Sequence, residues 1–137
     1  AVCGATYSFG ATYRCDLITE TIPDVRTLTD LLLEQNDPIR SLNNLARAGD
    51  LIRSLDEAGV YHVDLNASNI LLPQKLGESA WVVDFDRARV TAPGSTSFAN
   101  RMKYRLMRSI LKIRAPIGRA YGKSELWKAL SATNGHQ

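Results

Sequence analysis

The sequence predicts a mainly helical α+β chain, one domain or one lobe of a larger protein, with a small β-component at its N-terminal end and between helices. Its 137 residues, 45% of them hydrophobic and 23% charged, suit one folded domain with a buried core. Residues 2–19 are rich in strand formers, whereas the apolar residues of 39–58 and 101–114 recur at the helical period. No apolar run approaches the roughly 20 residues that a membrane-spanning helix needs.

The chain opens with a predicted β-hairpin formed by residues 2–9 and 13–19, because Gly10 interrupts two runs of strand-forming residues. A Pro-Asp pair then ends the β-structure. Thr27 follows, and threonine is one of the residue types that cap the start of a helix. We therefore expect a short helix over residues 28–34.

The longest predicted helix covers residues 39–58, whose apolar side chains fall on one face. Asp37 and Pro38 form a turn signal that also suits the start of a helix. Gly59 is expected to end the helix as a C-terminal cap. Gly49 lies in the middle and weakens the helix by about 1 kcal/mol relative to alanine, without overturning the prediction.

Short strands and basic helices follow. Residues 60–62 are a short apolar run, and the apolar residues 70–72 and 80–83 flank a turn, which predicts a second hairpin. A helix is then expected over 101–114. A Pro-Ile-Gly sequence breaks it, and residues 124–130 form a last short helix.

Charge divides the chain into two unequal parts. Residues 1–86 carry six basic and thirteen acidic residues, a balance of −7, whereas residues 87–137 carry eleven basic residues and one acidic residue, a balance of +10. This asymmetry predicts an anionic partner for the C-terminal part, with a solvated basic face as the alternative. No recognised nucleic-acid-binding motif accompanies the basic residues, so we expect no nucleic-acid partner.

The predicted helix over 101–114 combines an apolar face with basic residues. Its candidate contacts with an anionic surface are Arg101, Lys103, Arg105, Arg108 and Lys112. A basic amphipathic helix can lie on an anionic membrane, where each Lys or Arg contributes about 1 kcal/mol. The alternative is a core helix whose apolar face is buried and whose basic face is wet, and the two interpretations can coexist.

The residues most indicative of chemistry lie between the long helix and the second hairpin. Residues 62–72 read HVDLNASNILL, and residues 83–86 read VDFD. Phosphoryl transfer from a nucleotide needs a carboxylate beside the acceptor hydroxyl and hard oxygen ligands for magnesium. Asp64 is therefore the candidate catalytic base, and Asn69 and Asp84 are the candidate metal ligands.

Two further residues are accessory candidates within these motifs, His62 and Asp86. The structural alternative for the motif is that its Asp and Asn residues only form turns and end a strand. The order and spacing of the whole pattern favour the functional interpretation.

In these residues the chain resembles the C-terminal lobe of protein-kinase-like phosphotransferases. It is more similar to bacterial 3-deoxy-D-manno-octulosonic acid (Kdo) kinases, in residues 61–67 (YHVDLNA), 83–87 (VDFDR) and 13–23 (YRCDLITETIP). The resemblance implies a mainly helical catalytic C-lobe with a basic C-terminal region over residues 23–137. It also implies that residues 1–22 are the last strands of the N-lobe and the hinge.

The same resemblance implies an enzyme that phosphorylates an alcohol group, with ATP and Mg²⁺ as cofactors. Its acceptor would be a Kdo sugar of the lipopolysaccharide inner core, carried on a lipid A precursor or a related glycolipid. Glu20 and Ile22 would bind the nucleotide at the hinge. The protein would contact the cytoplasmic face of the bacterial inner membrane peripherally.

The chain departs from eukaryotic protein kinases in ways that disfavour a protein substrate. Val63 stands where those kinases have Arg, Asn66 where they have Lys, and no Ala-Pro-Glu follows the second motif. No Gly-rich phosphate loop or Val-Ala-x-Lys strand is present either, so we expect a fragment that lacks most of the N-lobe.

Two other functions stay open on the sequence. One is a small-molecule kinase of the aminoglycoside or choline type, which uses the same Asp and Asn spacing. The basic C-terminal region weighs against it, because cationic aminoglycosides favour an acidic surface. The other is a non-catalytic, pseudokinase-like module that binds lipopolysaccharide, although the intact Asp64, Asn69 and Asp84 argue against loss of activity.

Overall fold

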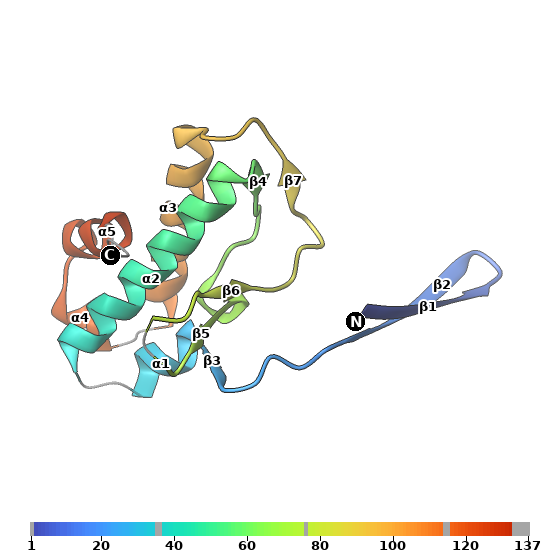
Figure 1. Cartoon of the computed structure of the whole chain (residues 1–137), viewed down its shortest axis with the longest axis horizontal. Coiled ribbons are helices and arrows are strands. Elements are labelled where there is room, and N and C mark those ends of the chain that lie inside the picture. Colours follow the sequence, from blue (N-terminus) through green and yellow to red (C-terminus); the bar gives the residue numbers. More distant parts are fainter. Residues whose placement is uncertain (1, 35–36, 76, 114–115, 133–137) are drawn as a thin grey trace.

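The computed structural model describes residues 2–34, 37–75, 77–113 and 116–132 and confirms a mainly helical α+β chain (Figure 1). Its elements, in chain order, are β1 (Val2–Phe9), β2 (Thr12–Thr19), β3 (Val25–Thr27), α1 (Leu28–Glu34), α2 (Pro38–Glu57), β4 (Val60–Tyr61), the 3₁₀ helix η1 (Ala67–Asn69), β5 (Ile70–Pro73), β6 (Trp81–Val82), β7 (Arg89–Val90), α3 (Thr96–Lys112), α4 (Pro116–Ala120) and α5 (Lys123–Ser131).

The predicted N-terminal hairpin is confirmed, and Figure 1 shows it projecting away from the helical body. Strands β1 and β2 pair antiparallel along their full length, from Val2 opposite Thr19 to Phe9 opposite Thr12. Gly10, the first residue of the two-residue loop, has a φ of +58°. A tight hairpin turn with a positive φ at this position favours glycine, which explains the break that the sequence shows there.

The predicted helix starts of α1 and α2 are also confirmed. The hydroxyl oxygen of Thr27 accepts a hydrogen bond from the backbone N–H of Asp30 at 3.0 Å. The carboxylate of Asp37 accepts one from the backbone N–H of Ile39 at 2.9 Å, directly before the first turn of α2. Each cap satisfies a backbone donor that the first turn of a helix leaves without an intrahelical partner.

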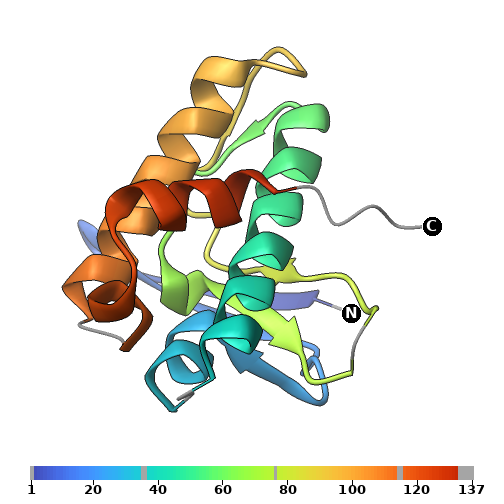
Figure 2. The same ribbon diagram turned by 90° about the vertical axis from the view of Figure 1, so that its left-hand side faces the viewer.

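The hydrophobic core lies where α2, α3 and α5 pack together, with α5 crossing the other two helices (Figure 2). Its fully buried side chains from these helices include Leu45, Ile52, Met102, Leu106, Ile110, Leu126 and Leu130. The described part of the chain contains no helix with the length and apolar character needed to cross a membrane.

Gly49 lies where α5 packs closely against α2. A Cβ atom at this position would collide with the backbone carbonyl oxygen of Leu130 in α5. Backbone atoms cannot rotate away as a flexible side chain can, so even alanine would push the two helices apart. The residue that the sequence marks as a local weakness of α2 is therefore what allows α5 to approach.

Two small sheets position the loops of the polar site. The predicted hairpin is confirmed as β5 and β6, with Ile70 opposite Val82, and β3 extends this sheet on the other side of β5. Strand β7, which the sequence analysis did not predict, pairs with β4 and places Val60 opposite Val90. This pairing holds the chain that follows β6 alongside the chain that follows β4.

The C-terminal helices differ from their expected bounds. Helix α3 begins at Thr96 rather than at residue 101, and its first turn carries Phe98, whose ring lies 4.8 Å from the ring of Tyr61 between centroids. This contact with β4 favours helix over loop at residues that carry no strong helical pattern. The Pro-Ile-Gly sequence that was expected to break the helix forms the start of the short helix α4, because proline suits the first helical position.

Candidate active site

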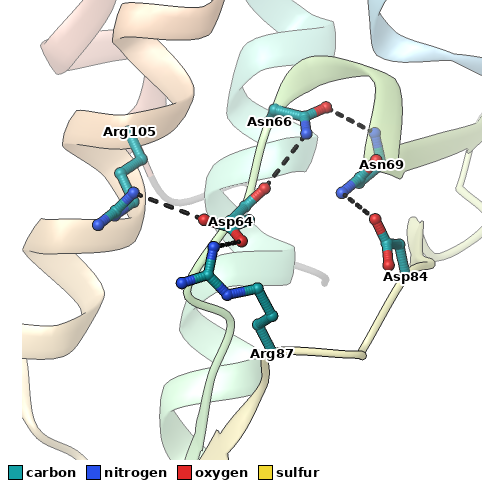
Figure 3. Close-up of polar contacts among 6 residues, drawn as sticks. All are labelled: Asp64, Asn66, Asn69, Asp84, Arg87 and Arg105. Carbon is teal, nitrogen blue, oxygen red and sulfur yellow. Dashed lines mark hydrogen bonds and ion pairs between the residues drawn. The ribbon is translucent and has the colours of Figure 1, made fainter. Parts of the chain in front are cut away.

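Three loops bring the predicted chemical residues together (Figure 3). Asp64 lies in the loop after β4, Asn69 ends η1, and Asp84 follows β6. The side-chain amide of Asn69 donates a hydrogen bond to the carboxylate of Asp84 at 3.4 Å. Residues that are fifteen positions apart in sequence thus share one polar site, as the motif predicted.

Asn66 shapes the loop that carries Asp64 and Asn69. Its side-chain oxygen accepts hydrogen bonds from the backbone N–H groups of Ser68 at 2.8 Å and Asn69 at 3.2 Å, which caps η1. Its side-chain amide donates to the backbone carbonyl of Asp64 at 3.2 Å. In the sequence, Asn66 stands out only as a departure from protein kinases, although an Asn directly before a short helix is a capping signal.

Asp84 has a backbone conformation that few residues other than glycine adopt. Its φ is +67°, in the left-handed region that costs a non-glycine residue roughly 1–3 kcal/mol. The backbone before it is fixed by a hydrogen bond of 2.9 Å from the N–H of Val83 to the carbonyl of Asn69. Local strain of this kind concentrates at functional sites, where the surrounding structure holds it in place.

His62 lies beneath this site rather than in it. Its side chain is buried, with the residue 1% exposed, and Nε2 lies 3.2 Å from the carbonyl oxygen of Val83. Its ring packs against the ring of Phe85 at 5.4 Å between centroids. His62 thus contacts the residues on both sides of Asp84, and its role in the chemistry stays a prediction.

Two arginines flank the Asp64 carboxylate. Arg87 Nη1 donates to Asp64 Oδ2 at 2.8 Å, and Arg105 Nη1 lies 3.8 Å from Asp64 Oδ1. Arg105 was predicted to contact an anionic surface, and no role was predicted for Arg87. The sequence could have indicated Arg87 by its place directly after the second motif. That its side chain reaches Asp64 depends on the pairing of β7 with β4.

The five basic residues predicted for an anionic surface do not share one face of α3. Arg101, Arg105, Arg108 and Lys112 follow the spacing that aligns side chains along one side of a helix. Lys103 lies on the side that faces α5, where its ammonium group is 3.4 Å from the Ser131 hydroxyl and 6.0 Å from the Trp127 ring centroid. Burial, with Arg53 nearby, lowers the pKa of Lys103.

The remaining predicted residues lie elsewhere. Glu20 and Ile22 belong to the segment between β2 and β3, which Figure 1 shows as an extended connection, and their nucleotide-binding role stays a prediction. Asp86 is exposed in the turn between β6 and β7.

The residues present fit a magnesium ion. Asn69 and Asp84 offer an amide oxygen and a carboxylate, the oxygen donors that Mg²⁺ prefers, and the Asn amide can present either its oxygen or its nitrogen at this distance. Within the described residues, no group of three or more His, Cys, Asp or Glu side chains could hold a metal. A magnesium site here would thus use few protein ligands and leave positions for water and phosphate oxygens.

The order and spacing of Asp64, Asn69 and Asp84, on loops supported by a helical body, are those of kinase-type phosphotransferases. Residues 1–129 match the model of the Lipopolysaccharide kinase (Kdo/WaaP) family. The chain belongs to this family, which confirms the resemblance drawn from its motifs.

Several relatives are named 3-deoxy-D-manno-octulosonic acid kinase. One from Vibrio parahaemolyticus is 37% identical over 103 residues, which cover 75% of this chain and 40% of the relative. One from Actinobacillus succinogenes is 36% identical over 119 residues, or 86% of this chain and 47% of the relative. One from Haemophilus influenzae is 40% identical over 79 residues, which cover 57% of this chain and 32% of the relative. The chain thus spans less than half the length of these relatives.

Proposed function

We propose that this chain is the catalytic-lobe part of an enzyme that transfers a phosphoryl group from ATP to a hydroxyl of a Kdo sugar in the lipopolysaccharide inner core. The observation that supports this most directly is the placing of Asp64 beside the Asn69–Asp84 pair in a chain of the Kdo/WaaP family. The names of its relatives supply the acceptor sugar.

Each residue of the site has a distinct role in this proposal. Asp64 accepts the proton of the acceptor hydroxyl, a step that contributes about 10²–10⁴-fold to a rate. Asn69 and Asp84 hold magnesium, which would neutralise charge on the phosphate oxygens. Glu20 and Ile22 bind the nucleotide at the hinge. The matched residues cover only 40% and 47% of the relatives, so we infer that a further segment of the natural protein covers the phosphates.

The test of this proposal is the magnesium dependence of nucleotide binding. We expect Asp84→Ala and Asn69→Ala, each made in the full natural protein, to raise the magnesium concentration needed for half-maximal ATP binding by at least about tenfold. The reason is that each variant removes one of few protein oxygen ligands. The measurement is a fluorescence or calorimetric titration of ATP at several magnesium concentrations.

Glu78→Ala is the matched control, because Glu78 is an exposed acidic residue outside the site whose carboxylate lies 3.7 Å from the ammonium group of Lys75. The control should bind magnesium and ATP like the unmodified protein. An unchanged magnesium dependence in both site variants would remove the metal-ligand assignment and, with it, the main support for the proposal.

We also propose that α3 brings the enzyme to its lipid-linked acceptor at the cytoplasmic face of the inner membrane. Arg108 and Lys112 line, together with Lys123 of α5, a surface hollow of about 300 Å³ whose other lining residues are Tyr104, Met107 and Leu111. A hollow with apolar walls and a cationic rim suits the phosphate and acyl groups of an anionic glycolipid. A cationic aminoglycoside would be repelled there.

Replacing Arg101, Arg108 and Lys112 together by Gln should weaken binding to anionic vesicles by about 100-fold at low salt, because each charge contributes about 1 kcal/mol near such a surface. Co-sedimentation with phosphatidylglycerol vesicles, at low and high salt, measures this. Lys103→Gln is the control, because it removes a charge from the same helix on the side facing α5. Salt-independent and equal sedimentation of all variants would leave α3 as a core helix only.

A further inference from the structure

The arrangement of charge around Asp64 is unbalanced, because two guanidinium groups meet one carboxylate. Arg87 reaches it from the turn between β6 and β7, and Arg105 reaches it from α3. Only Arg87 is within hydrogen-bond distance, at 2.8 Å. Among the residues that the structure describes, Arg105 has no hydrogen bond to a side chain, so its donors stay available to a ligand.

These contacts contribute little to the stability of the fold. The side chain of Arg87 is 70% exposed, that of Arg105 46% and that of Asp64 40%. Ion pairs between groups this exposed contribute about 0–1 kcal/mol, because water and salt screen them. A structural role therefore does not account for two arginines that converge from separate elements on one small site.

The arginines and the candidate metal ligands lie on different sides of Asp64, which determines how an acceptor could be oriented in the site. In Figure 3, Asp64 lies between the arginine pair on one side and the Asn69–Asp84 pair on the other. A hydroxyl that binds at Asp64 and receives a phosphoryl group from the Asn69–Asp84 side leaves the rest of its sugar on the arginine side. That side presents two guanidinium groups, whereas a neutral sugar needs no cationic partner.

We propose that Arg87 and Arg105 bind the carboxylate of the acceptor sugar and thereby select a sugar acid over a neutral sugar. The inference rests on the proposed function, whose acceptor is an octulosonic acid by the name of the relatives. The planar guanidinium group offers paired donors that match the two oxygens of a carboxylate, which is why arginine suits this task better than lysine. Both residues are positioned to orient the hydroxyl toward Asp64.

The test compares the binding of free 3-deoxy-D-manno-octulosonic acid with that of its uncharged methyl ester, without ATP. Ligand-observed NMR or calorimetry on the full natural protein should show that the acid binds about 10–100-fold more tightly than the ester, as expected for a charge-assisted hydrogen bond. Arg87→Gln and Arg105→Gln should each reduce this preference by about tenfold. Arg87→Lys should restore only part of it, because lysine lacks the paired donors.

Arg89→Gln is the matched control, because Arg89 is an exposed arginine of β7 only two residues from Arg87. It should keep the full preference for the acid, and thermal unfolding of each variant checks that the fold is retained. Equal binding of acid and ester by the unmodified protein would overturn the inference, as would an equal loss of preference in Arg89→Gln.

Phosphoryl transfer in the presence of ATP and magnesium separates this inference from the function on which it rests. If the protein phosphorylates acid and ester with equal KM, the arginine assignment is wrong and the proposed function stands. If the acid binds in an arginine-dependent way but is never phosphorylated, the arginine pair is a sugar-acid site and the proposed function is wrong.

Discussion

Asp64→Asn is expected to lower the rate of phosphoryl transfer by about 10²–10⁴-fold while leaving the fold intact. The amide is nearly the same size as the carboxylate and keeps an oxygen that can accept a hydrogen bond from Arg87, but it cannot take up a proton from the acceptor hydroxyl. The loop itself should survive, because Asn66 bonds the backbone carbonyl of Asp64 rather than its side chain.

The measurement is kcat of the full natural protein at saturating ATP, magnesium and Kdo acceptor, together with the midpoint of thermal unfolding. Glu78→Gln serves as the control, because it removes one negative charge from an exposed site in the turn between β5 and β6. A rate for Asp64→Asn within tenfold of the unmodified protein would remove this carboxylate from the proposed mechanism. A large loss of stability would instead mark Asp64 as a structural residue.

Ile110→Ala is expected to lower the free energy of unfolding by about 2–5 kcal/mol. Ile110 is fully buried in the cluster where α3 packs against the rest of the core, as is Leu106 one turn earlier. Truncating it removes apolar contacts and leaves a cavity that the tightly packed helices can fill only in part. The effect on acceptor binding should be small, because the change lies on the inner face of α3.

Urea denaturation, followed by circular dichroism, measures this change, and an unchanged slope would show that the midpoint reports stability alone. The matched control on the same helix is Arg108→Gln, an exposed position where the change in unfolding free energy should stay within about 0.5 kcal/mol. If both variants were equally stable, the apolar face of α3 would not contribute to the core as the structure indicates.

Helices, hairpins and the order of the site residues were predictable from the sequence because their signals are local. The helical period of α2, its Asp37 cap and the glycine in the N-terminal hairpin act over a few residues, and each predicted element was found. Asp64, Asn69 and Asp84 were identifiable because their spacing is a pattern along the chain. The separation of Lys103 from the other basic residues of α3 could also be predicted from the sequence, because helical spacing alone places it on another face.

Contacts between distant segments were decided only by the tertiary structure. A strand of two residues such as β7 has no periodic signal, and its pairing with β4 depends on a partner thirty positions away. From the sequence, Gly49 only weakens helix α2, whereas the structure shows that α5 packs against it where a Cβ atom would not fit. Arg87 and Arg105 both contact Asp64 because three separate segments of the chain come together there. Such long-range contacts cannot be predicted from local sequence patterns.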